Sequence, residues 1–336
     1  MGIILLRGVF AGSRYLCGMG RFNTLSGTLL IGVSLVLVAT ACNTRPTSDA
    51  FDASTTTSST LLVEDVATTT TPTLPPPEER ITATVVSITD GDTITVSLGG
   101  VEVDLRMLGI NAPELSECWG PESSAALAAM VENTSVLLVA GEEDVDQFDR
   151  VLRYVFLETS DGPVFVNQEM VKSGNAIGMS NGHEQNRNFK LLEARAFESG
   201  LGMWATFACG NAEGIAADRP VVRVSEVQYD PDGPDDERLE DEFVVIVNEG
   251  YGRVFMSGWV LRDESSSNRL TLPNQTVLAP GESLTIVTGC TGGPEGAVHW
   301  CSDNAVWSNQ GDTVIVSDTL GNAVIRYAYA ADDQLG

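Results

Sequence analysis

The chain has 336 residues, which exceeds an ordinary domain of about 100 to 200 residues and predicts at least two domains. Hydrophobic residues make up 43% of it, enough for real cores. A formal net charge of −27 excludes nucleic-acid binding through a broad basic surface, because affinity for phosphate backbones comes mainly from clustered Lys and Arg.

The N-terminal segment carries the pattern of an export signal. An apolar run at 29–38 is followed by small residues at 39–41 and then by Cys42. This order resembles a bacterial lipoprotein signal, in which the cysteine carries lipid and becomes the mature N-terminus. We therefore predict a signal peptide over residues 1–42, or from an alternative start at Met19, and a product outside the cytoplasm that is anchored to the membrane through Cys42 or secreted. An uncleaved anchor is the other interpretation, although the run is short of the roughly 20 residues that span a bilayer.

The next segment, 43–79, is dominated by Thr, Ser and Pro and holds few large apolar side chains. Such a segment cannot bury enough surface to offset its ordering entropy, so we predict a disordered tether. Beyond it the composition changes twice, which predicts one folded domain over 80–210 and a second over 219–330.

The first domain mixes strand and helix patterns. Alternating β-branched runs predict strands at 81–88, 93–98, 101–110, 135–141 and 152–158. Helices are predicted at 121–132, 166–173 and 187–199, where Pro stands near a start and Gly follows an end. A small barrel with interspersed helices, an α+β fold, is therefore expected.

Several polar residues of this domain do not suit a plain core, namely Asp90, Asp92, Arg106, Asn111, Glu114 and Arg150. Carboxylates can hold a hard cation that lowers the pKa of bound water, and guanidinium groups can stabilise the extra charge on a reacting phosphate. The set suits metal-assisted phosphodiester hydrolysis. Only two histidines, His183 and His299, are present, which argues against histidine-metal nucleases and a Ser-His-Asp triad.

Six successive motifs resemble the staphylococcal nuclease (thermonuclease) family and span Arg80 to Cys209: ATVVSITDGDTITV, LRMLGINAPE, CWGPESSAAL, DQFDRVLRYVF, VNQEMVKSGNA and HEQNRNFKLLEARAFESGLGMW. The resemblance implies an OB-fold barrel with three helices and a calcium-dependent endonuclease that hydrolyses DNA or RNA by attack of water.

The same resemblance implies roles for individual residues. Arg106 and Arg150 match the catalytic arginines, and Glu114 matches the carboxylate that positions or activates the water. The implied metal ligands are Asp92, Asn111 and the backbone oxygen of Ala112. Asp90 is implied to lie next to these ligands without binding the metal directly.

The sequence also departs from the family pattern. Asn111 stands where a second metal aspartate is usual, so metal affinity should fall. Gln147 and Phe148 replace a Lys-Tyr pair, and Ile177 and Met179 replace later tyrosines, so substrate binding should be weaker. From Arg80 to Gly210 there are eight basic and nineteen acidic residues, which should steer nucleic acid poorly.

The six cysteines sort by region. Cys17 and Cys42 lie in the leader, and each domain holds one further pair, Cys118 with Cys209 and Cys290 with Cys301. This distribution predicts one disulfide per domain in an oxidising compartment, and buried free thiols are the alternative.

The second domain is predicted to be all β. Its strand patterns lie at 221–229, 241–250, 255–263, 283–290, 312–318 and 323–329. The phrases SEVQYDP, DEFVVIVNEG, MSGWVLRD, TVLAPGESL, WSNQGDTVIVSD and AVIRYAY resemble the lamin-tail domain, an immunoglobulin-like sandwich. The acidic run Asp230 to Glu242 is interpreted as a solvated loop rather than a calcium loop. Trp259, Trp300 and Trp307 fit the sandwich core better than a carbohydrate-binding face.

Two functions are weighed. The first is a membrane-tethered extracellular endonuclease whose partners are nucleic acid and, through Cys42, the membrane; the sequence points to no protein partner. The second is a catalytically weak or inactive nucleic-acid-binding or adhesion lipoprotein. Retention of Asp92, Arg106, Glu114 and Arg150 favours the first, whereas Asn111 and the acidic surface favour the second.

Overall fold

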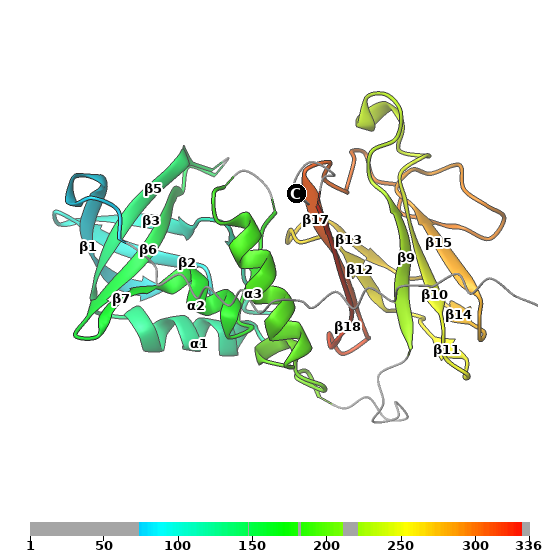
Figure 1. The fold of residues 1–336 in the computed structure, drawn as a ribbon, viewed down its shortest axis with the longest axis horizontal. Coiled ribbons are helices and arrows are strands. Elements are labelled where there is room, and N and C mark those ends of the chain that lie inside the picture. Colours follow the sequence, from blue (N-terminus) through cyan, green and yellow to red (C-terminus); the bar gives the residue numbers. More distant parts are fainter. Residues whose placement is uncertain (1–73, 147, 181–182, 211–220, 331–336) are drawn as a thin grey trace, which may run out of the picture. The chain divides into compact units, whose positions relative to one another are not determined.

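The computed structural model describes residues 74–146, 148–180, 183–210 and 221–330, all within one compact unit, Ala67–Gly336 (Figure 1). The predicted signal peptide, the lipid site at Cys42 and the predicted tether as far as residue 73 lie outside the described residues. The last residues assigned to the tether are placed: Leu74 packs against the first core and Pro77–Glu79 form a 3-10 helix. The first domain is therefore ordered from before the predicted start at Arg80.

The first domain is a closed barrel. Its sheet has the order β3-β2-β1-β5-β6-β7, with every neighbouring pair antiparallel. The strands are β1 (Arg80–Ile88), β2 (Thr93–Leu98), β3 (Val101–Met107), β5 (Ser135–Val145), β6 (Val151–Thr159) and β7 (Gly162–Phe165). A parallel pairing of β3 with β6 joins the two ends, with Arg106 opposite Leu152. The predicted OB-type barrel is confirmed.

Three helices accompany the barrel, as predicted: α1 (Gly120–Val131), α2 (Val166–Lys172) and α3 (Asn186–Glu198). Pro121 stands in the first turn of α1, where its missing N–H costs nothing. Gly174 and Gly200 follow α2 and α3 with positive φ, the conformation that ends helices and favours glycine. The short strands β4 (Ile110–Asn111) and β8 (Ile177–Gly178) pair beside the barrel, and Gly202–Trp204 form a 3-10 turn after α3.

The second domain is a sandwich of two four-stranded sheets around one core. One sheet is β16 (Val298–His299), β15 (Ser283–Val287), β10 (Phe243–Asn248) and β9 (Val222–Gln228). The other is β13 (Arg269–Thr271), β12 (Val260–Arg262), β17 (Gly311–Ser317) and β18 (Ala323–Ala330). A two-stranded pair, β11 (Val254–Phe255) with β14 (Val277–Leu278), and a 3-10 turn at Asp235–Glu237 complete it.

Large aromatic side chains build the sandwich core. Trp259 and Trp307 are buried, and Trp300 packs edge-on against Trp307. Their interpretation as core residues is confirmed, because a binding face would leave the rings exposed. Within the acidic run, Glu242 is likewise buried and accepts hydrogen bonds from the backbone N–H groups of Val306 and Trp307.

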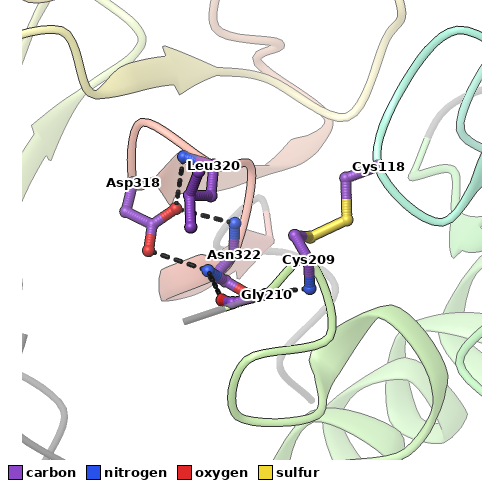
Figure 2. The surroundings of a disulfide bond; sticks show 6 residues. All are labelled: Cys118, Cys209, Gly210, Asp318, Leu320 and Asn322. Carbon is purple, nitrogen blue, oxygen red and sulfur yellow. Dashed lines mark hydrogen bonds between the residues drawn. A yellow bond between two sulfur atoms is a disulfide. The ribbon is translucent and has the colours of Figure 1, made fainter. Parts of the chain in front are cut away.

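Both predicted disulfides are present, Cys118–Cys209 and Cys290–Cys301. Figure 2 shows the first of them beside Asn322 of the second domain, which accepts a hydrogen bond from the Cys209 backbone and donates one to the Gly210 carbonyl. Within the described part of the chain, no helix is both long and apolar enough to cross a bilayer.

Candidate active site

The turn between β1 and β2 places the first candidate carboxylates. The Asp90 side chain accepts a hydrogen bond from the Asp92 backbone at 3.0 Å and so closes the turn. Gly91 lies against α1, where a Cβ would come within 1.9 Å of the Ser123 hydroxyl. Only glycine therefore lets the turn approach the helix this closely. The Asp92 backbone carbonyl accepts from Met107 N–H at 2.8 Å, which fixes the turn to the end of β3.

Asp92 is buried, with 4% of its surface exposed. One carboxylate oxygen accepts from the Thr93 hydroxyl at 3.0 Å, and the other accepts from Ala112 N–H at 2.5 Å and pairs with Arg106 at 2.9 Å. Burial raises the pKa of Asp92 to about 7, against the lowering effect of Arg106, and the neighbouring Asp90 carboxylate raises it further. A buried carboxylate beside a second one favours a bound proton or a cation.

Arg106 is the central donor of the site. Besides Asp92, its guanidinium donates to the backbone oxygens of Met107 and Ile110 and, at 3.0 Å, to the side-chain oxygen of Asn111. These contacts account for an arginine within an apolar strand: its charge is paired and its donors are satisfied. The strand β4 and the bond from Arg106 together bring Asn111 beside Asp92.

A cavity of about 850 Å³ lies over this arrangement. Arg106 and Asn111 line it from the barrel, and Arg150 lines it from the loop that precedes β6. Because β3 and β6 are paired in parallel, Arg106 on β3 and Arg150 just before β6 reach the same cavity. Two guanidinium groups that face one space can bind a phosphate diester, and the Glu143 and Asp146 carboxylates line the same cavity.

The loop before β6 holds Arg150 in place. The Arg150 guanidinium pairs with Asp146 at 2.7 Å and lies 5.4 Å from the centre of the Phe148 ring. Burial raises the pKa of the Asp146 carboxyl, but hydrogen bonds from the Arg150 backbone and guanidinium and from the Phe148 backbone outweigh it and hold the pKa below its usual value. Phe148 itself is 68% exposed, so its ring is open to a base.

The donor set fits a hard divalent cation. The Asp92 carboxylate and the Asn111 amide oxygen lie together, since Arg106 contacts both, and the Ala112 N–H donates to the Asp92 carboxylate. Carboxylate, amide and backbone carbonyl oxygens are donors of the kind that calcium and magnesium prefer. Only one of the three carries a charge, and among the described residues no group of three or more His, Cys, Asp or Glu is placed to hold a metal. A cation on the Asp92 oxygen that pairs with Arg106 would have to displace that guanidinium, whereas the other oxygen accepts from the Thr93 hydroxyl.

Asp90, Asp92 and Ala112 do not line the cavity, but contacts within the turn and with Arg106 join them to it, whereas no such contact joins Glu114 among the described residues. Glu114 lies on an exposed turn after Pro113, where its backbone N–H donates to Glu117, and it is not among the residues that line the cavity. Its role with the attacking water stays a prediction, as do the ligand and catalytic roles of the other residues.

The structure adds residues to the cavity that the sequence did not indicate. His183 lies in its wall, where its ring contacts the Tyr154 hydroxyl and the Met179 carbonyl, and burial lowers its pKa. Further lining comes from the second domain, at Ser265–Ser267 and Ser308–Gln310. No periodicity or motif could have placed those serines next to Arg106, because they lie more than a hundred residues away in the chain.

Comparisons with known proteins identify both domains. The staphylococcal nuclease homologue family matches residues 104–206, and the lamin tail domain family matches residues 216–331. An uncharacterized endonuclease of Haemophilus influenzae is 30% identical over 128 residues, which cover 38% of this chain and 68% of the relative. Protein ParB of Escherichia coli is 33% identical over 127 residues, covering 36% of this chain and 71% of the relative.

A thermonuclease of Staphylococcus hyicus is also similar, at 32% identity over 99 residues, which cover 28% of this chain and 56% of that protein. The matched residues include the end of β3 with Arg106, the short strand with Asn111 and the loop with Arg150. The chain belongs to the staphylococcal nuclease family, and a lamin tail domain follows its nuclease domain.

Proposed function

We propose that this chain is an exported, calcium-dependent endonuclease that hydrolyses phosphodiester bonds of DNA or RNA and is tethered to the cell envelope. Membership of the nuclease family makes it a nucleic-acid hydrolase. The observation that supports catalysis by this chain is the cavity shared by Arg106, on β3, and Arg150, in the loop just before the adjacent strand β6.

The two arginines have separable tasks. Arg150, half-buried and held by Asp146, is placed to bind a non-bridging oxygen of the scissile phosphate. Arg106, freed from Asp92, is placed to stabilise the charge that develops as the fifth oxygen bonds to phosphorus. The remaining donors of Arg106 to the Met107 and Ile110 carbonyls keep it oriented while it does so.

Asp92, the Asn111 side-chain oxygen and the Ala112 carbonyl are the proposed calcium ligands, with Asp90 behind them. A bound calcium ion would supply Lewis-acid polarisation of the phosphate and lower the pKa of a bound water. Glu114 orients that water or accepts its proton, which requires the exposed turn after Pro113 to approach the cavity when substrate binds.

Export is supported by the disulfides. Cys118–Cys209 and Cys290–Cys301 each close a loop within or at the edge of one domain, as is common in proteins of oxidising compartments. Anchoring at Cys42 rests on the lipoprotein-like signal alone.

A nuclease assay tests the proposal. Wild type with millimolar calcium should degrade plasmid DNA or RNA, and chelator should stop it. Arg106→Lys, which keeps the charge but loses the forked donors, should lose about a hundredfold or more of the rate. The matched control is Arg195→Lys, since Arg195 is exposed on α3 outside the cavity. Equal rates for the two variants would contradict the proposal.

The second candidate function is a weak or inactive nucleic-acid-binding lipoprotein. Asn111 in place of a charged ligand and the position of Glu114 outside the cavity favour it. It predicts calcium-independent binding of oligonucleotides without hydrolysis, whereas the proposed function predicts turnover that chelator abolishes.

A further inference from the structure

Two arginines of the lamin tail domain stand directly opposite each other. Arg262 ends β12, Arg269 begins β13, and the two residues are partners in the antiparallel register of these strands. Side chains in opposed positions leave a sheet on the same face, with Cβ atoms about 4.5 to 5.5 Å apart, and like charges in such a pair are destabilising. The pair therefore needs negative charge close by.

Arg269 has that negative charge. Its Nη1 pairs with the Glu117 carboxylate of the nuclease domain at 2.6 Å, and its Nε donates to the Ser266 carbonyl at 3.0 Å. One arginine of the pair is thus neutralised by a residue of the other domain.

Arg262 is not neutralised in this way. It is half-buried, and among the described residues no carboxylate forms an ion pair with it. Its guanidinium, which has five N–H donors, makes one hydrogen bond there, from Nη1 to the Ser265 carbonyl at 3.5 Å. Burial lowers the pKa of Arg262 to about 10, and the nearby Arg269 lowers it further. The carboxylates that act in the opposite direction are those of Glu117, Asp263 and Glu193. At neutral pH the group is still a cation, and its burial is costly until an anion pairs with it.

A pocket of about 290 Å³ is lined by both arginines; we call it the arginine pocket. Its walls come from both domains, with Arg262, Arg269, Ser317 and Thr319 on the lamin-tail side and Glu117 on the nuclease side. None of the described residues that line it also lines the nuclease cavity, so the two sites are separate.

The two carboxylates in the walls of the arginine pocket already have partners. Glu117 pairs with Arg269. Asp318 accepts hydrogen bonds from the backbone and the side chain of Asn322 within its own turn (Figure 2). The Arg262 cation is therefore the one charge of this pocket that has no ion-pair partner in the described part of the chain.

We propose that the arginine pocket binds a small anion of the phosphate class, either free phosphate or the phosphate group of a small monoester, on the Arg262 guanidinium. The site goes beyond the proposed function and does not depend on it, because the pocket and the nuclease cavity have no lining residue in common. An anion bound there would also reduce the repulsion between Arg262 and Arg269.

The donors of the arginine pocket suit a phosphate. A guanidinium fork binds two phosphate oxygens at once, and the hydroxyl groups of Ser317 and Thr319 are of the kind that commonly contact phosphate oxygens. Val260, Ile315 and Leu320 add apolar lining that could contact the organic part of an ester. The volume lies at the lower end of the range of about 300 to 1,000 Å³ found for small-molecule pockets, which limits the ligand to a small one.

Calorimetric titration of the full chain with inorganic phosphate tests the proposal. Phosphate can also reach the nuclease cavity, so every protein carries Arg150→Met, and a chelator removes divalent cations. In this parent, Arg262→Met is compared with Arg223→Met, which removes an exposed arginine that pairs with Glu249 on β9, outside the pocket. Thermal unfolding without phosphate shows whether each variant folds.

The parent should bind phosphate with a dissociation constant of about 1 mM or tighter, Arg262→Met should bind it about tenfold or more weakly, and Arg223→Met should match the parent. Phosphate should raise the unfolding temperature of the parent and of Arg223→Met but not that of Arg262→Met, because a ligand of the folded state stabilises it by mass action. Absence of phosphate binding by the parent, or equal affinities of the two variants, would overturn the proposal.

Thr319→Glu gives a second test that leaves both arginines in place and decides the question if Arg262→Met does not fold. Thr319 is exposed in the wall of the pocket, so the added carboxylate should pair with Arg262 and weaken phosphate binding about tenfold. Thr291→Glu, exposed and outside the pocket, should keep the affinity of the parent. The same affinity in both glutamate variants would contradict the assignment.

Titration with a nucleoside monophosphate and with its nucleoside separates the two sources of the phosphate group. Tighter binding of the monophosphate than of inorganic phosphate identifies an ester as the ligand, and equal or weaker binding identifies free phosphate. The nucleoside alone should not bind. Binding of the nucleoside as tightly as its monophosphate would show that the pocket does not recognise phosphate.

Discussion

The side-chain nitrogen of Asn111 donates a hydrogen bond of 2.9 Å to the backbone carbonyl of Glu264, a residue 153 positions further along the chain. This bond joins the corner of the nuclease barrel that holds the proposed metal ligands to the loop Asp263–Asn268 of the lamin tail domain. The amide therefore has two neighbours to satisfy, Arg106 through its oxygen and Glu264 through its nitrogen. Stability and metal affinity should consequently respond in opposite directions to a change at this residue.

Asn111→Asp should raise calcium affinity, because a second carboxylate joins Asp92, and should lower the unfolding free energy without calcium by about 1 to 3 kcal/mol, because the Glu264 carbonyl loses its donor. Calorimetric titration with calcium and thermal unfolding in chelator measure the two effects. Asn111→Ala serves as the control, since it should lose stability and gain no affinity. Unchanged calcium affinity in Asn111→Asp would show that position 111 is not a ligand.

The buried pair between Lys190 and Glu264 should be costly to break. Lys190→Met leaves the Glu264 carboxylate buried without its cation, which typically costs about 3 to 5 kcal/mol. The control is Lys172→Met, because Lys172 pairs with Glu169 on an exposed helical face, where such pairs contribute about 0 to 1 kcal/mol. Urea denaturation of both variants gives the comparison, and similar losses would mean that the Lys190 pair does not hold the domains together.

Stability should fall as pH rises above about 4. Burial raises the pKa of Asp312 well above its usual value, and the nearby Glu264 and Asp263 carboxylates raise it further, against the effect of Lys190. Above the ordinary aspartate pKa, near 3.8, the unfolded chain has lost this proton while the folded chain keeps it. Unfolding therefore becomes more favourable with rising pH, by at most about 1.4 kcal/mol per pH unit for each such group.

Asp312→Asn isolates that effect. The amide oxygen can still accept from the Thr313 backbone, whose bond to Asp312 measures 2.6 Å, but the side chain no longer titrates. Urea denaturation of wild type and variant across the acid to neutral range should give a shallower decline for the variant. Parallel declines would mean that Asp312 is ionised in the folded protein.

Gly91→Ala should destabilise the nuclease domain by about 1 to 3 kcal/mol or prevent its folding, because the new methyl group would overlap the Ser123 hydroxyl on α1. Gly252→Ala is the matched control, since no atom lies within 4 Å of a Cβ there, and it should stay within about 0.5 kcal/mol of wild type. Thermal unfolding of the two proteins measures the difference. A stable Gly91→Ala protein would mean that the turn bearing Asp92 can withdraw from the helix.

Local pattern was enough to predict most elements. The strand runs before Gly99, the three helices and the sandwich core were all predicted, since each depends on periodicity and on flanking Pro or Gly. Where a turn interrupts a run, the prediction was too long: 255–263 divides into β11 and β12 around Gly258, whose φ is +77°. The break between the two strands depends on the backbone conformation at Gly258, which the alternation of apolar and polar residues does not encode.

The candidate site was harder to predict from the sequence, because contacts between segments far apart in the chain bring its residues together. Motif order identified Asp92, Arg106 and Arg150, and the structure brings the two arginines to one cavity. The loop Asp263–Asn268 could not be found this way, because its place beside Asn111 depends on contacts between the two domains. The motif also does not show where Glu114 lies, and in the structure it stands on an exposed turn.

The parallel seam between β3 and β6 has a consequence for when the protein becomes active. Arg106 and Arg150 reach one cavity only when that seam closes, because it joins strands that lie far apart in the chain. An unfolded chain keeps the two guanidinium groups apart, so the proposed phosphate site forms only as the barrel closes, and folding itself sets when the chain can act.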